Sequence, residues 1–176
     1  MVLKGCLKMA ENYILIGYMG AGKTTVGKAL SRETGKKFLD TDSMIVKQMN
    51  LSINDIFEKY GEAYFRDLET NLLKNLCESD MDCVISCGGG LPLREENRAY
   101  LKRLGKVVYL NVNEMDIIRR LKNDTTRPLL RGPREEVKQR IHDMIEQRDP
   151  IYREAADVVI KTGRMKIADI VNKIIS

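Results

Sequence analysis

A glycine-rich stretch near the start of the chain constrains the fold most strongly. Residues 17–25, GYMGAGKTT, follow the apolar run YILI and precede the helix-like segment VGKALSRET. The spacing Gly17, four residues, Gly22, Lys23, Thr24 is that of a phosphate-binding loop between a strand and a helix. In such a loop backbone N–H groups surround a β-phosphate, the lysine reaches the β and γ oxygens, and the threonine hydroxyl can bind Mg²⁺. The chain is therefore expected to bind a nucleotide.

Short apolar runs alternate with segments of helical period along the rest of the chain. The runs are YILIG, KFLDTD, DCVISCGGG, KVVYLNV and DVVIK. This alternation predicts an α/β fold with a five-stranded parallel sheet. The strand at 13–17 is expected to be central because ligands of such sheets bind beyond the carboxyl ends of the strands. The loops after Leu39 and Cys87 should then lie at the same rim as Lys23.

Length and composition narrow the class of protein. With 176 residues, four prolines and no low-complexity tract, the chain is expected to form one domain over 1–176. The four cysteines lack metal-site spacing. The first 20 residues lack a signal-peptide cleavage site, and no run reaches the ~20 apolar residues of a membrane span. We therefore expect a cytoplasmic protein without membrane contact.

The charge distribution indicates small phosphorylated ligands. The chain carries 30 basic and 25 acidic residues, and arginines gather between Arg119 and Arg153 with few aromatic residues among them. This pattern favours arginines that close over the phosphates of a small ligand rather than arginines that bind a nucleic acid. A basic face that only keeps the protein soluble is an alternative. Within it, residues 123–134 (NDTTRPLLRGPR) predict a mobile lid, with a plain surface loop as the alternative.

The acids for metal and proton chemistry are expected at the second strand. In many nucleotide hydrolases another strand ends in an aspartate that holds Mg²⁺, but VISC runs into GGG with no acid. One carboxylate of Asp40 and Asp42 can organise the water shell of the metal while the other approaches an acceptor hydroxyl. Either can instead cap the helix expected near Ser43, and both roles can hold. Residues 88–90 form either a backbone cradle for a ligand or a structural turn.

Two helical segments carry arginines next to apolar faces. Residues 53–76 predict two helices broken near Gly61, with Arg66 beside their apolar stripe. The helix REEVKQRIHDMIEQR has an apolar face that ends at Arg148, which either snorkels to solvent or points at a buried anion. Arginines left unpaired beside a cleft are costly, so we expect an anionic substrate group to complete Arg66 and Arg148.

In their order along the chain, these stretches resemble shikimate kinase. The matching segments are GYMGAGKTT, DTD, FRDLE, GGG, RPLL and RDPIYREAAD, and the likeness runs from about Tyr13 to the C-terminus. It implies a three-layer α/β/α P-loop kinase of the nucleoside monophosphate kinase type, with a mobile lid and substrate-binding helices at about 42–78. The implied reaction is ATP-dependent phosphorylation of the 3-hydroxyl of shikimate to shikimate 3-phosphate, a step of chorismate and aromatic amino acid biosynthesis.

The resemblance also implies a role for each matching position. Lys23 would contact the transferred phosphate, and Thr24 would bind Mg²⁺ with Asp40 supporting the metal through water. Asp42 would act as the base, which makes Lys23, Asp42 and Arg127 the implied catalytic residues. The implied nucleotide-binding residues are Gly20, Ala21, Gly22, Lys23, Thr24, Thr25, Arg120 (against the adenine) and Arg127 (closing on the phosphates). The implied acceptor-binding residues are Asp42, Arg66, Gly88, Gly89, Gly90 and Arg148.

Other functions compete with this one. A gluconate kinase or another small-molecule P-loop kinase is the nearest alternative. A nucleoside monophosphate kinase should aim more basic residues at a second phosphate, whereas gluconate, like shikimate, offers one carboxylate to Arg66 and Arg148. A nucleotide-dependent regulatory or nucleic-acid-binding module is the alternative from another class. We expect a monomer that binds ATP and shikimate and no nucleic acid.

Overall fold

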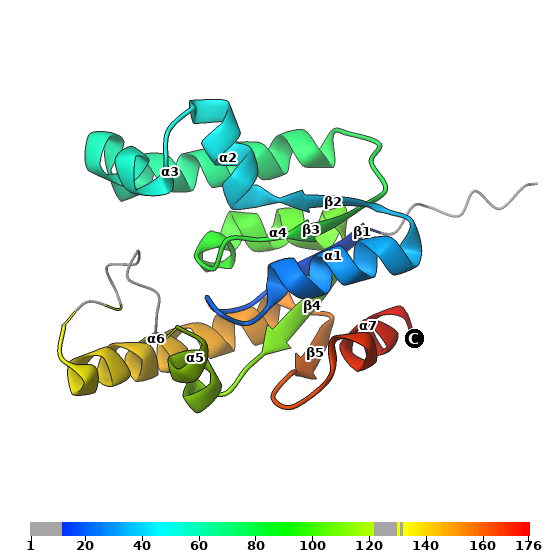
Figure 1. The fold of residues 1–176 in the computed structure, drawn as a ribbon. Coiled ribbons are helices and arrows are strands. Elements are labelled where there is room, and N and C mark those ends of the chain that lie inside the picture. Colours follow the sequence, from blue (N-terminus) through cyan, green and yellow to red (C-terminus); the bar gives the residue numbers. More distant parts are fainter. Residues whose placement is uncertain (1–11, 122–129, 131) are drawn as a thin grey trace, which may run out of the picture.

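The computed structural model of the chain describes residues 12–121, 130 and 132–176. Its strands are β1 (Asn12–Ile16), β2 (Lys37–Asp40), β3 (Cys83–Ser86), β4 (Gly105–Asn111) and β5 (Val158–Lys161). Its helices are α1 (Lys23–Thr34), α2 (Thr41–Met49), α3 (Ile53–Cys77), the short 3₁₀ helix η1 (Leu91–Leu93), α4 (Glu95–Leu104), α5 (Glu114–Leu121), α6 (Arg134–Ala155) and α7 (Ile167–Ile175). Strands and helices alternate along most of the chain (Figure 1).

The strands form one parallel sheet in the order β2-β3-β1-β4-β5. The strand β1 is central, as predicted, and Ile14 pairs with Ile85 on one side and with Val107 on the other. All three residues are fully buried. Their continuous apolar character follows from this position, because a central parallel strand is covered on both faces.

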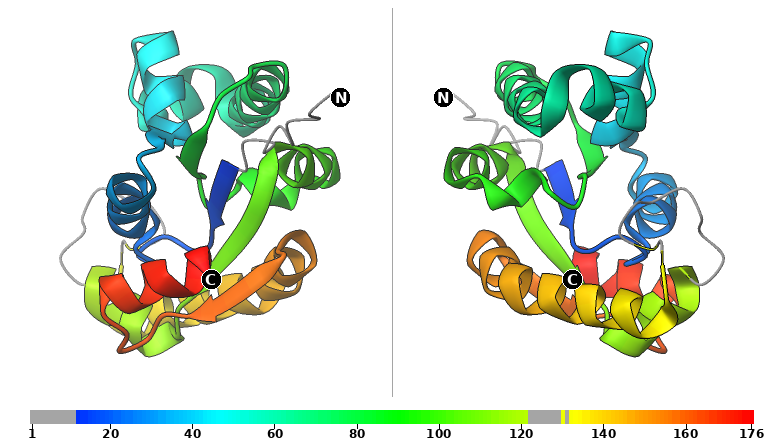
Figure 2. Two further views of the ribbon diagram at one scale, coloured as in Figure 1. Left: turned by 90° about the vertical axis from the view of Figure 1, so that its right-hand side faces the viewer. Right: turned by 90° about the vertical axis from the view of Figure 1, so that its left-hand side faces the viewer.

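Helices cover both faces of the sheet and complete the predicted three layers (Figure 2). One face carries α1 and α7, which pack against each other. The other face carries α4 and α6, with α3 packed against α4. None of the helices in the described ranges combines the length and hydrophobicity needed to cross a bilayer.

The sequence predicted the break in α3 correctly but placed the end of α6 too early. The predicted break in α3 is confirmed, because Gly61 adopts φ 85° and ψ 168°, a conformation that only glycine takes readily. The helix predicted to reach Arg148 instead continues through Pro150 to Ala155. Proline removes one helical hydrogen bond, but the added turns bury Tyr152 and Ala155 completely, which offsets that loss.

Most of the predicted lid cannot be placed in this fold. Of residues 123–134, only Leu130 and 132–134 belong to the described part of the chain. Arg127, predicted to close on the phosphates, lies outside the described residues. The segments that flank the predicted lid, α5 and α6, pack against each other.

Candidate active site

A cleft of about 1080 Å³ opens at the carboxyl ends of the central strands. The phosphate loop and the start of α1 form one side, α2 and α3 form another, and the glycines after β3 and one residue of α6 complete it. It gathers twelve of the predicted site residues: Gly20, Gly22, Lys23, Thr24, Thr25, Asp40, Asp42, Arg66, Gly88, Gly89, Gly90 and Arg148. The loops predicted to share one rim therefore do so.

The phosphate loop ends in a helix N-terminus that no side chain caps. Gly20 and Gly22 have φ values of 72° and 90°, in the left-handed region that favours glycine. Gly22 is the N-cap of α1 and makes no side-chain capping bond, so the first N–H groups of the helix are open to an anion. Nζ of Lys23 donates to the carbonyls of Gly17 and Tyr18, at 2.8 Å each. The lysine is thus held over the loop that would receive the phosphates.

Asp40 takes the capping role that the sequence offered, and its metal role stays a prediction. It is the N-cap of α2, and its Oδ1 accepts the backbone N–H of Ser43 at 3.1 Å. Its Oδ2 lies 3.4 Å from the Thr24 hydroxyl, which donates to it. The cap uses one carboxylate oxygen and the other faces the start of α1. Asp42 is not the cap, and it lies in the first turn of α2 and lines the cleft.

The three glycines after β3 make room for cleft side chains. A methyl group added at Gly88 would collide with the Asp42 carboxylate, and one at Gly90 would collide with the Arg66 guanidinium. The Gly88 N–H also donates to the Thr41 hydroxyl at 2.9 Å, which ties this turn to α2. The segment is therefore a fixed turn that lies against two cleft side chains, and its role as a backbone cradle for a ligand stays a prediction.

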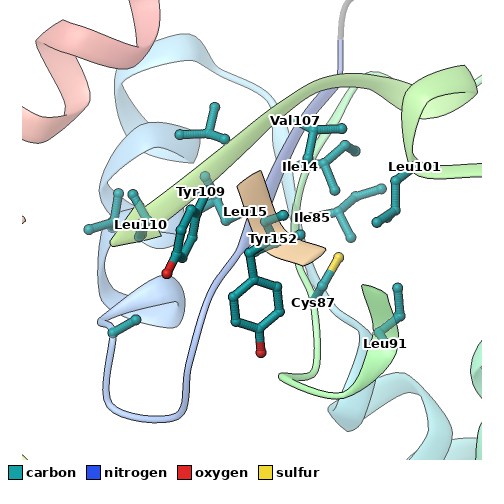
Figure 3. Packing of buried hydrophobic residues seen from close by; sticks show 14 of the residues in the cluster. Ile14, Leu15, Ile85, Cys87, Leu91, Leu101, Val107, Tyr109, Leu110 and Tyr152 are labelled. Atoms are coloured by element: carbon teal, nitrogen blue, oxygen red, sulfur yellow. The ribbon is translucent and has the colours of Figure 1, made fainter. Parts of the chain in front are cut away.

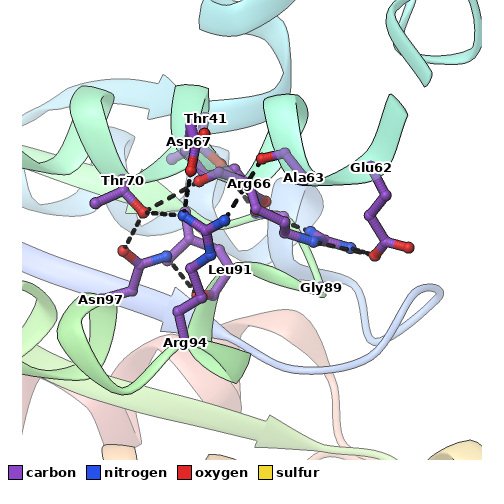
Figure 4. A network of polar contacts seen from close by, with 12 residues as sticks. Thr41, Glu62, Ala63, Arg66, Asp67, Thr70, Gly89, Leu91, Arg94 and Asn97 are labelled. Carbon is purple, nitrogen blue, oxygen red and sulfur yellow. Dashed lines mark hydrogen bonds and ion pairs between the residues drawn. The ribbon is translucent and has the colours of Figure 1, made fainter. Parts of the chain in front are cut away.

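Arg66 already has carboxylate partners, so the premise that it is left unpaired is wrong. Its Nη2 donates to Glu62 at 2.9 Å (Figure 4), and its Nη1 donates to Glu69 at 2.8 Å. All three residues lie on one side of α3 because residues three and four apart share a helix face. The two contacts fix the guanidinium at the cleft wall while leaving part of its N–H donor set unused.

Glu69 is a cleft residue that the sequence reasoning missed. Its side chain is 1% exposed, and its Oε1 is buried without a hydrogen-bond partner among the described residues. Burial raises the pKa of Glu69 to about 7, although Arg66 opposes the shift, while the charge of Asp42 adds to it. Its i+3 spacing from Arg66 was the available clue in the sequence. Only the fold shows that this carboxylate lines the cleft.

Arg148 extends the apolar face of α6 into the cleft rather than toward solvent. Ile141 and Met144 on that face are buried, and Arg148 lines the cleft one turn further on. Among the residues that the structure describes, no carboxylate forms an ion pair with it. Its positive charge is therefore available to an anionic ligand.

The remaining predicted nucleotide residues lie at the edge of the site. Ala21 is buried in the loop and does not line the cleft. Arg120 is outside the cleft lining as well, and its Nη1 donates to the Gly20 carbonyl of the phosphate loop at 2.9 Å. Its predicted contact with the adenine stays a prediction.

The fold and the cleft define a class of protein. A phosphate loop with an open helix N-terminus, two carboxylates from the segment after the second strand and an arginine-lined wall at the carboxyl edge of a parallel sheet are the parts of a kinase. The cleft is large enough for a nucleotide and a second small molecule together. These features define a small-molecule kinase of the P-loop class.

Comparisons with known proteins give the particular family. The sequence model of the shikimate kinase family matches residues 19–176. A shikimate kinase of Burkholderia lata is 44% identical over 164 residues, which cover 93% of this chain and 88% of the relative. A solved structure, shikimate kinase from Acinetobacter baumannii in complex with shikimate, has a TM-score of 0.86 and 40% identity, and covers 94% of this chain and 90% of that one. The chain belongs to the shikimate kinase family.

The alternative acceptor suggested by the sequence has weaker support. A gluconokinase from Sinorhizobium meliloti shares 15% identity and a TM-score of 0.52 over 94% of this chain and 90% of that one. At this identity the similarity shows a common fold and nothing about the acceptor.

Proposed function

We propose that this chain transfers the γ-phosphoryl group of ATP to the 3-hydroxyl of shikimate. The observation that carries the proposal is the position of Arg148. This arginine has no carboxylate partner among the described residues, and it lines the same cleft as Lys23 and Asp42. A site with this arrangement suits an acceptor that has both a carboxylate and a nucleophilic hydroxyl.

Each part of the cleft has its own role in this reaction. The open N-terminus of α1 and Lys23 bind the phosphates and stabilise the charge that develops during transfer. Arg148, Arg66 and the backbone of residues 88–90 hold the acceptor carboxylate and ring hydroxyls. Asp42 then accepts the proton of the attacking hydroxyl. Arg127 closes on the phosphates, and Arg120 lies against the adenine.

The oxygen donors next to the phosphate loop suit Mg²⁺. The Thr24 hydroxyl and Oδ2 of Asp40 lie 3.4 Å apart and both residues line the cleft, and hard oxygen donors are what this ion prefers. Thr24 would bind the ion directly, and Asp40 would bind it through water. The bound ion supplies charge neutralisation of the phosphates.

We also infer that the chain works as a single domain over 1–176 and as a monomer in the cytoplasm. The described strands form one sheet with helices on both of its faces (Figure 2), which supports a single domain. ATP and shikimate are then its small-molecule partners, and nucleic acid is not one.

The proposal is tested by an ADP-release assay with shikimate, gluconate and AMP run in parallel. Turnover with shikimate far above the other two is the expected result. Comparable or faster turnover with gluconate or AMP would assign a different acceptor, and steeply salt-dependent binding of RNA or DNA without turnover would favour the nucleic-acid-binding alternative.

The carboxylate contact is best tested at Arg148. In Arg148→Ala, kcat/KM for shikimate should fall by ~30-fold or more, about 2 kcal/mol, while KM for ATP changes little. Arg66→Ala is a less clean test because it also strips the buried Glu69 of its partner. Shikimate methyl ester, which lacks the charge, should be a poor substrate of the unchanged enzyme and lose much less in Arg148→Ala. Equal use of acid and ester would refute the contact.

The raised pKa of Glu69 predicts that shikimate binding depends on pH. Above pH 7 the carboxylate is ionised and competes with the shikimate carboxylate for Arg66, whereas below pH 7 it is protonated and neutral. The affinity for shikimate, measured by calorimetry, should therefore weaken by roughly 3- to 10-fold from pH 6 to pH 8. Glu69→Gln should remove this dependence. Glu62→Gln, which changes the exposed partner of the same arginine, should keep it. An unchanged pH profile in Glu69→Gln would contradict the assignment.

A further inference from the structure

Three tyrosines form a buried cluster beneath the cleft. Tyr18, Tyr109 and Tyr152 are each at most 1% exposed, although they come from the phosphate loop, β4 and α6. Their ring centroids lie 4.9 to 6.1 Å apart, and the Tyr18 ring meets the other two edge-on. The ring of Tyr152 lies between Tyr109 and the loop that leads to Leu91, with its hydroxyl pointing at that loop (Figure 3). The proposed mechanism uses none of these side chains.

Each hydroxyl of the cluster has a different partner. The Tyr18 hydroxyl donates to the Ile145 carbonyl at 3.2 Å, which links the phosphate loop to α6. The Tyr109 hydroxyl donates to Asp149 at 2.8 Å, which links β4 to α6. The Tyr152 hydroxyl instead donates to the Gly89 carbonyl at 2.5 Å. It alone of the three contacts the glycine segment of the acceptor site.

The bond from Tyr152 orients the peptide between Gly89 and Gly90. The described peptide bonds are all trans, and in a trans peptide the C=O and the following N–H point in opposite directions. Holding the Gly89 carbonyl against α6 therefore directs the Gly90 N–H away from α6. The Gly90 backbone faces the guanidinium of Arg66. The hydroxyl thus sets the direction of a backbone donor at the wall that holds Arg66.

The same hydroxyl lies beside the second acceptor arginine. Arg148 is four residues before Tyr152 on the same side of α6. Burial raises the pKa of Tyr152, and the nearby Arg148 guanidinium only partly opposes the shift, so the hydroxyl keeps its proton and remains a donor. One buried phenol therefore lies between the glycine segment and Arg148.

Gly89 also joins the acceptor side of the cleft to the phosphate side. A methyl group added at Gly89 would lie 3.6 Å from the Gly17 carbonyl and 3.8 Å from both the Met19 nitrogen and the Tyr152 hydroxyl. The residue thus faces both the phosphate loop and α6. These are ordinary van der Waals distances, so the space beside Gly89 would hold a methyl group, and the bond from the Tyr152 hydroxyl to the Gly89 carbonyl is the contact that fixes the rotation of the peptide.

We propose that Tyr152 is a positioning residue for the acceptor. Its hydroxyl fixes the peptide of Gly89 and the guanidinium of Arg148 in the arrangement that binds the acceptor carboxylate. The part of the proposal that concerns shikimate rests on the proposed function, whereas the part that concerns the Gly89 peptide does not.

The test compares Tyr152→Phe with Tyr109→Phe. Each variant removes one hydrogen-bonded hydroxyl from the same cluster and keeps the ring that packs there. Tyr152→Phe should raise KM for shikimate roughly 10-fold, because the unsatisfied Gly89 carbonyl and its peptide reorient, with less than ~2-fold change in KM for ATP. Tyr109→Phe should lower the melting temperature comparably and leave KM for shikimate unchanged. Placing 4-aminophenylalanine at position 152, which restores a donor there, should return KM toward the original value.

A second measurement does not depend on the acceptor. Amide hydrogen exchange of the peptide spanning Gly88 to Leu91, without substrates, should be faster in Tyr152→Phe than in the unchanged protein and in Tyr109→Phe. If the unchanged enzyme does not use shikimate, the proposed function fails while this exchange result still supports or refutes the role of Tyr152. Equal exchange in all three proteins, or equal shifts of KM in the two phenylalanine variants, would overturn the inference.

Discussion

Replacing Lys23 by alanine is expected to reduce phosphoryl transfer by at least ~10³-fold while leaving the protein folded. The ammonium group lies over the phosphate loop, where negative charge develops on the transferred group, and no other lysine lines the cleft in the described part of the chain. In the structure it makes two hydrogen bonds to loop carbonyls, so its loss should lower the free energy of unfolding only slightly, by about 1 kcal/mol. ADP release and a thermal melt measure the two effects separately.

Lys28→Ala is the matched control for this variant. Lys28 lies on the same helix, is exposed and does not line the cleft, so the change in charge and in helix composition is the same. It should retain normal turnover. Near-normal turnover in Lys23→Ala would mean that the phosphate loop does not work as proposed.

Replacing Asp42 by asparagine is expected to lower kcat by ~10²-fold or more. The amide keeps the shape of the side chain and its place over Gly88 but cannot accept the proton of the acceptor hydroxyl. Because the contact with the acceptor is largely kept, KM for shikimate should change much less than kcat. Steady-state kinetics at saturating ATP separate the two constants.

Asp143→Asn provides the control for the lost charge. Asp143 is an exposed carboxylate on α6 outside the cleft, and its variant should have an unchanged kcat. If Asp42→Asn keeps its kcat and only binds shikimate more weakly, Asp42 positions the acceptor and another group takes the proton.

The sequence predicted the phosphate loop because its backbone conformation requires particular residue types. The turns at Gly20 and Gly22 need positive φ values, which single out glycine, and the following lysine and threonine then occupy fixed places at the start of α1. The apolar runs and the helical periods between them predict a parallel sheet whose loops share one rim. The glycine turns, the apolar runs and the helical periods depend on neighbours along the chain, so the sequence was sufficient to predict them.

The tertiary structure decided the surroundings of the charged side chains in the cleft. Glu69 looks like one more surface acid of a long helix, and only the packing of α3 at the cleft buries it, pairs it with Arg66 and raises its pKa. That pairing also overturned the expectation of an unpaired Arg66.

The bond between Tyr152 and Gly89 joins residues 63 positions apart. A buried tyrosine hydroxyl can donate its hydrogen bond to a backbone carbonyl, a carboxylate or solvent. Which of these it meets depends on the distant segments that the fold brings together. The sequence by itself therefore determined the phosphate loop, the central place of the strand that leads into it and the candidate charges. The fold alone determined how those charges are paired and which buried groups hold them in place, because burial and long-range contacts have no local signature.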